Sequence, residues 1–170
     1  MRKLEGFQRG INLGGWLSQG PLDKHHLDTF IVEDDIKKIA GWGADHVRLP
    51  LDYENVETEE GGDIEEGYRH IEDCISWCRK YNLNMVLDLH KTPGYIFDDQ
   101  DYSKDFFHNE ELQERFLNLW KKIISRFAKD ADIVMFELLN EVASFNVVDE
   151  WNELSARAVK VIRELSLIYI

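Results

Sequence analysis

The chain has 170 residues, of which 44% are hydrophobic, so it is long and apolar enough to bury the core of one domain. Its formal net charge of −13 argues against nucleic acid or an anionic membrane as a partner, because both need a basic protein surface. No run of about 18 apolar residues is present, so no transmembrane helix is expected.

The first ten residues, MRKLEGFQRG, are not typical of a secretory signal, because no apolar segment follows the basic residues. We therefore expect a cytoplasmic protein, or a secreted protein whose signal has been removed.

The first half of the chain alternates between short apolar runs and longer segments with apolar residues at helical spacing. In chain order the pattern predicts a strand, a helix, a strand, a helix and a strand, over residues 8–13, 33–42, 45–50, 64–81 and 83–90. Gly43 is the expected end of the first helix, and Pro50 is expected to end the second strand. His25 and His26 are predicted to lie on a loop between the first strand and the first helix, rather than to bind substrate.

The second half continues the same alternation after a long aromatic loop. It predicts a helix over 110–128, a strand over 132–140 and a helix over 149–165. The final residues 166–170, SLIYI, are typical of the beginning of a fifth strand. Strands separated by helices pair in parallel, so residues 1–170 are expected to form one α/β domain with a parallel sheet.

Two cysteines, Cys74 and Cys78, lie four residues apart on a predicted helix. This spacing places both on one helix face, where they would act as small apolar core residues. A metal or redox role is the weaker alternative, since such sites usually use the CxxC spacing.

Sites in parallel α/β folds form at the carboxyl ends of the strands. The residues there form a mixed polar and aromatic set: Asn12, Trp16, Arg48, Asp52, Tyr53, Asp88, His90, Asn140 and Glu141. The set lacks a nucleophilic serine or cysteine beside a base, a phosphate-binding glycine loop and a metal-ligand cluster. We therefore expect no cofactor and no metal at this site.

Aromatic faces and hydrogen-bonding groups suit sugar rings, and glycoside hydrolysis needs two carboxylates that flank the glycosidic oxygen. One carboxyl must stay protonated near neutral pH, held by a partly apolar site or a nearby negative charge. Glu141, at the end of a buried strand, is the candidate for that acid. Asn140 is a candidate donor to the sugar 2-hydroxyl.

Four stretches, RGINLGGWL, HVRLPLDY, LDLHKTPG and FELLNEV, occur in order at the expected strand ends. Together they make residues 8–145 resemble the N-terminal half of glycoside hydrolase family five, the family of many cellulases and β-glucanases. The resemblance implies about the first four βα units of an eight-stranded βα barrel of the TIM type, plus the start of strand five. It also implies a retaining mechanism on β-linked glucan, without a cofactor.

The resemblance also implies roles for particular residues. Glu141 corresponds to the general acid/base, and Asn140 to its neighbour that contacts the substrate. Arg48 corresponds to the arginine that holds the catalytic nucleophile in place. His90 corresponds to the histidine beside the subsite that holds the sugar to be cleaved, and Trp16 to a residue that lines the cleft.

Tyr95 and Phe145 are candidates for substrate binding, although loop packing is an open alternative for both and for Phe97. Glu137 and Glu141 are four residues apart, so their side chains would point to the same face of the sheet, with Glu137 further inside the strand. It is predicted to be a buried, hydrogen-bonded structural residue.

The family's nucleophile is a second glutamate on strand seven, and the resemblance assigns no residue of this sequence to it. The main hypothesis is therefore a retaining endo-β-glucanase that is incomplete and inactive as this chain. The alternative is a non-catalytic half-barrel that binds glycan or associates with itself, because open sheet edges invite a homodimer. Another βα-barrel enzyme would need a lysine nucleophile, a metal cluster or a phosphate site, none of which is visible. The linkage, the sugar and endo or exo action stay open.

Overall fold

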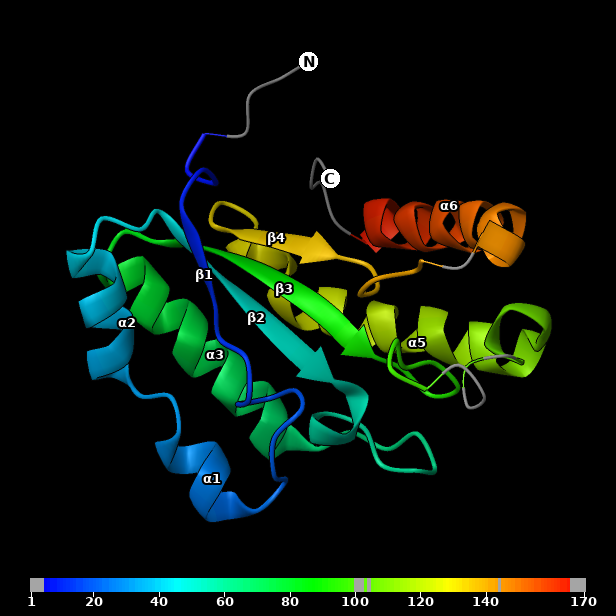
Figure 1. Ribbon diagram of the computed structural model, residues 1–170, viewed down its shortest axis with the longest axis horizontal. Coiled ribbons are helices and arrows are strands. Elements are labelled where there is room, and N and C mark those ends of the chain that lie inside the picture. The colour runs from blue at the N-terminus through cyan, green and yellow to red at the C-terminus, as the bar shows by residue number, and fades with distance from the viewer. Residues whose placement is uncertain (1–4, 100–102, 104, 144, 166–170) are drawn as a thin grey trace.

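The computed structural model describes residues 5–99, 103, 105–143 and 145–165, which contain a four-stranded parallel sheet. Its strands are β1 (Gly10–Asn12), β2 (His46–Asp52), β3 (Asn84–Lys91) and β4 (Val134–Glu137). The strands lie in the order β1-β2-β3-β4, the same as their order in the chain (Figure 1). Each βα unit therefore lies beside the next, which is the arrangement of consecutive units in a βα barrel.

The helices are α1 (Lys24–Thr29), α2 (Glu33–Gly41), α3 (Glu65–Lys80), α5 (Glu110–Phe127) and α6 (Val148–Leu165). The described residues also form four short 3₁₀ turns, η1 (Tyr53–Asn55), η2 (Phe106–His108), η3 (Ala128–Asp130) and η4 (Phe145–Val147). In Figure 1, α2 and α3 lie on the flank of β1 and β2, whereas α5 and α6 lie on the flank of β4. No helix in the described part of the chain is long and apolar enough to cross a membrane.

The two faces of the sheet differ because side chains alternate along each strand. Val47, Leu49 and Leu51 of β2 are fully buried, in one core with the apolar faces of the helices. The opposite face carries residues of the other parity, such as Arg48 and Glu137, which are only partly buried. Helices thus cover one face, and in a complete barrel the other face lines the interior.

The alternation of strands and helices predicted from the hydrophobic pattern is confirmed, and both cysteines are buried, free core residues. Strand β2 nevertheless continues past Pro50 to Asp52, contrary to the prediction. The pairing of β1 with β2 ends at Asn12 and Arg48. The backbone of Arg48 faces β1, because its carbonyl accepts from the Leu13 N–H. Pro50 lies two residues further along β2 and faces the same side. The pairing with β1 has already ended there, so the N–H that proline lacks breaks no bond to β1.

One other boundary differs, and one element was not predicted. Strand β4 ends at Glu137, earlier than the predicted 140. The prediction that His25 and His26 lie on a loop is wrong, because both belong to α1. Asp23 caps this helix by accepting from the backbone N–H of His26, a local signal that the hydrophobic pattern does not contain. The predicted start of a fifth strand, 166–170, lies outside the described residues.

Candidate active site

A cleft of about 250 Å³ lies at the carboxyl ends of the strands. Strands β1, β2 and β3 and the loops that follow β1, β3 and β4 contribute to its wall. The lining residues are Asn12, Gln19, Arg48, His90, Ile96, Phe97, Asp98, Asn140 and Glu141. The structure therefore brings together Glu141, Asn140, Arg48 and His90, the four residues predicted as catalytic.

Arg48 links residues from all four strands. Its Nε and Nη2 atoms donate to the two carboxylate oxygens of Glu137, at 2.8 and 2.9 Å. Its Nη2 also lies 2.8 Å from Asp88 Oδ2 and donates to Asn140 Oδ1 at 3.0 Å, while Nη1 donates to Asn12 Oδ1 at 3.0 Å. The hydrogen bonds to Glu137 raise the pKa of Arg48, so this group is a fixed cation.

Asp88 is the buried partner of both Arg48 and His90. Its side chain is 0% exposed, and its Oδ2 lies 2.7 Å from His90 Nδ1. Asp88 and His90 are two residues apart on β3, so both side chains lie on the same face of the sheet. Burial raises the pKa of Asp88, although His90 and Arg48 oppose this shift. The contact orients the imidazole at the cleft wall, and the spacing Asp-x-His is the sequence signal for it.

Asn140 and Glu141 lie in a turn after β4, not at the end of the strand as predicted. The Asn140 N–H donates to the carbonyl of Leu89 at 3.2 Å, and the Tyr95 hydroxyl donates to the Glu141 carbonyl at 3.0 Å. Glu141 has a φ of 47°, in the left-handed region that few non-glycine residues adopt. These two hydrogen bonds fix the backbone of the turn at Asn140 and Glu141. The exposed Glu141 side chain lines the cleft.

Two of the predicted aromatic residues, Trp16 and Tyr95, do not line the cleft. Trp16 is 1% exposed, donates from Nε1 to the Leu27 carbonyl at 2.8 Å and stacks on Trp77, so the expectation that it lines the cleft is wrong. Tyr95 is 5% exposed and packs on aromatic rings, so it supports the Glu141 turn from beneath rather than offering a ring to a ligand. The side chain of Phe145 lies outside the described residues.

Glu137 is hydrogen-bonded as predicted, but its side chain is 37% exposed and not buried. The reason is that it lies on the face of the sheet that the described helices leave uncovered.

Sequence reasoning missed Gln19 and Asp98 and favoured loop packing for Phe97. Gln19, with a φ of 56°, donates from its N–H to Asp52 at 2.9 Å, and its side chain reaches Asp98 at 3.5 Å. Phe97 is 41% exposed and lines the cleft. These residues come from two loops far apart in the chain, so no local pattern signals that they meet.

The family model described as Cellulase (glycosyl hydrolase family 5) matches residues 11–167. The chain belongs to glycosyl hydrolase family 5. Among curated family members, it is 48% identical to Cellodextrinase A of Ruminococcus flavefaciens, over 98% of this chain and 49% of that protein. It is 45% identical to Endoglucanase C of Acetivibrio thermocellus, over 94% of this chain and 47% of that protein. The chain thus spans about half the length of the curated family 5 relatives it matches.

Solved family 5 structures agree with the fold. Cel5A of Thermotoga maritima, solved in complex with cellobiose, is 26% identical with a TM-score of 0.74, over 94% of this chain and 49% of that chain. A second structure of the same protein, in complex with mannotriose, gives the same identity, TM-score and coverage. The sheet and helices described above are therefore half of a βα barrel of the TIM type, as the sequence predicts.

Proposed function

We propose that this chain supplies the acid/base half of a retaining endo-β-glucanase site, with Glu141 as the general acid and base. The observation that carries the proposal is the exposed Glu141 carboxylate in a cleft that it shares with Asn140, Arg48 and His90. Family membership and the cellodextrinase and endoglucanase relatives support glucan as the substrate.

The proposed reaction begins when Glu141 donates its proton to the glycosidic oxygen as the bond to the anomeric carbon breaks. A second carboxylate attacks that carbon from the opposite side and forms a covalent glycosyl-enzyme. Glu141 then removes a proton from water, which attacks the same carbon and releases the sugar with retained configuration. Asn140, the neighbour of Glu141, is proposed to hydrogen-bond the sugar.

The second carboxylate is proposed to come from outside these 170 residues. Glu137 and Asp88, two acidic residues beside the cleft, are both held by Arg48. Arg48 is proposed to hold the nucleophile as well, since its guanidinium is a fixed cation at the cleft wall. The 170-residue chain by itself is accordingly expected not to hydrolyse glucan.

The test is a chimera in which residues 1–170 replace the matching half of Cellodextrinase A of Ruminococcus flavefaciens. We expect it to hydrolyse cellotetraose, and Glu141→Gln to slow this about a hundredfold to ten-thousandfold, the usual contribution of an acid/base group. The loss in kcat/KM should be much smaller on a dinitrophenyl cellobioside, because kcat/KM reports the first bond-breaking step and that leaving group departs without a proton. Values of kcat/KM on both substrates measure the difference.

The matched control is Glu72→Gln, a glutamate exposed on α3 and remote from the cleft lining, which should hydrolyse at the parent rate. A folded chimera that cleaves mannotetraose but not cellotetraose would overturn the glucan assignment. An equal loss for Glu141→Gln on both substrates would overturn the role of Glu141 as the acid.

A further inference from the structure

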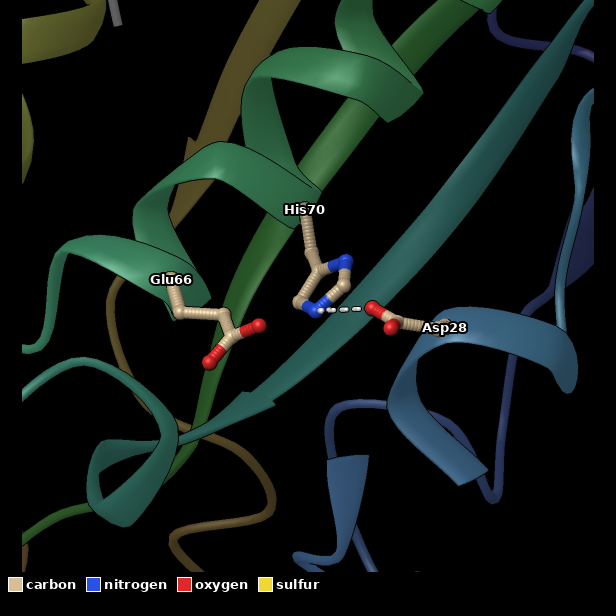
Figure 2. Close-up of side chains that lie close together, drawn as sticks. All are labelled: Asp28, Glu66 and His70. Atoms are coloured by element: carbon tan, nitrogen blue, oxygen red, sulfur yellow. Dashed lines mark ion pairs between the residues drawn. The ribbon is translucent and has the colours of Figure 1, made fainter. Parts of the chain in front are cut away.

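Three side chains with metal-ligating atoms meet between α1 and α3, away from the cleft. Glu66 and His70 lie four residues apart on α3 and therefore share one helix face. Asp28, on α1, points toward them from the facing helix (Figure 2). One ligand atom of each, a carboxylate oxygen or an imidazole nitrogen, lies within 4.8 Å of the other two.

His70 is the residue that distinguishes this cluster from an ordinary group of surface charges. Its side chain is only 5% exposed, and its buried Nε2 atom has no hydrogen-bond partner among the residues that the structure describes. This atom lies 3.6 Å from Asp28 Oδ1, too far for a hydrogen bond, and faces that carboxylate (Figure 2). A buried nitrogen without a partner lowers the stability of the fold, unless an atom between His70 and Asp28 binds it.

We propose that Asp28, Glu66 and His70 bind a divalent transition-metal ion of the zinc type. Imidazole nitrogen and carboxylate oxygen are both ordinary zinc ligands, and three protein ligands leave one position for water. Zinc bonds of about 2.0 Å place tetrahedral ligands about 3.3 Å apart. The Asp28–His70 separation is already close to this value, and the partly exposed Glu66 side chain has room to approach.

The ring of His70 is held in place for such a role. Trp16 packs edge-on against it, with 6.0 Å between ring centroids. Burial, and to a smaller extent Arg69, lowers the pKa of His70, against the opposing effect of Asp28, Asp73 and Glu66.

In this structure the ammonium group of Lys24 is the cation that pairs with the carboxylates of Asp28 and Glu66. Its ammonium contacts Asp28 Oδ2 at 2.9 Å and also contacts Glu66, while Arg69 lies 3.2 Å from the same glutamate. The Lys24 side chain is 66% exposed, so it can move into water when a metal ion arrives. Metal and Lys24 then compete for the same two carboxylates, which makes Lys24 a sharp test of the site.

The bound ion would connect the six-residue helix α1 to α3, and would stabilise an element with no fully buried side chain. None of the three ligands lines the cleft, so the site is independent of the proposed hydrolysis.

The experiment is calorimetric titration of the 170-residue chain with Zn²⁺ in excess Mg²⁺, which occupies carboxylate-only surface sites. We expect one Zn²⁺ per chain and a higher melting temperature, reversed by a chelator. His70→Phe keeps an aromatic ring against Trp16 but removes the nitrogen, and should weaken binding at least about tenfold. Lys24→Met should tighten binding several-fold, whereas a purely structural ion-pair cluster would only lose stability.

His25→Ala is the matched control, because it removes an exposed histidine of the same helix as Asp28 and should leave the affinity unchanged. Glu66→Gln provides the same test at a partly exposed position if His70→Phe does not fold. Equal Zn²⁺ affinity in the parent chain and in the ligand variants, or no binding at millimolar Zn²⁺, would overturn the proposal.

Discussion

At the scale of single residues, Arg48 is the position on which the cleft depends most. It lies on β2 and contacts Asn12 of β1, Asp88 of β3 and Glu137 of β4. Its bond to Asn140 also positions the residue before Glu141. A flexible ammonium cannot reproduce this planar set of donors, so lysine is not an equivalent substitute.

We predict that Arg48→Met lowers the free energy of unfolding by about 3 kcal/mol, the lower end of the range for a broken buried ion pair. The main reason is that Asp88, which is 0% exposed, loses its cation. Urea denaturation of the parent and the variant at neutral pH measures the difference.

The same variant should show a distinctive pH dependence. Burial already raises the pKa of Asp88 above its ordinary value, so the folded state holds a proton there more tightly than the unfolded state. Without Arg48 this shift grows, and the stability deficit should shrink as the pH falls toward the ordinary range of an aspartate. The second substitution Asp88→Asn should remove most of the deficit at neutral pH, and a deficit independent of pH would contradict this account.

At the scale of elements, α3 shows how close packing overrides helix propensity. Gly67 lies in its first turns, directly against η1, and a Cβ atom at this position would lie 1.8 Å from the carbonyl oxygen of Asn55. Asn55 cannot easily move, because its side chain donates to the Leu17 carbonyl at 2.7 Å. A glycine in a helix is therefore required here by the approach of another segment of backbone.

We predict that Gly67→Ala destabilises the protein by about 1–3 kcal/mol, although alanine is the better helix former. Gly41→Ala is the matched control, since nothing lies within 4 Å of the added methyl group at the end of α2. That substitution should be neutral or stabilise by about 0.5 kcal/mol. Thermal melts of both variants decide the matter, and equal effects would show that packing against η1 is not the cause.

At the scale of the whole molecule, the sheet has one face covered by helices and one face partly open. Val86 and Met135 are apolar residues on that second face, which is only half-buried. The sheet of the described residues also ends on two edge strands, β1 and β4. Parallel sheets usually have both faces covered, and open edges invite pairing with another chain.

We predict that the 170-residue chain associates with itself when it is expressed alone. Light scattering during gel filtration should give a mass well above 20.0 kDa that falls on dilution. Met135→Lys should shift the equilibrium toward the monomer, because it places a charge on the open face. A monomer at every concentration, with cooperative unfolding, would contradict the prediction.

The sequence by itself determined the alternation of strands and helices, since the periods of 2 and 3.6 are local properties of the chain. It also determined that Arg48, His90 and Asn140–Glu141 lie at one edge of the sheet, because parallel strands end together. The same reasoning placed Glu141 at a strand end, whereas it lies in a turn with a positive φ. The hydrogen bond from Tyr95 to this turn joins residues far apart in the sequence.

Only the tertiary structure decided which candidates reach the cleft. Trp16 and Phe97 are both aromatic residues near strand ends, yet one is buried against Trp77 and the other lines the cleft. The four-strand contact of Arg48 and the group formed by Asp28, Glu66 and His70 likewise join separate elements. Such contacts depend on how helices and loops pack in three dimensions, so the spacing of residues along the chain does not predict them.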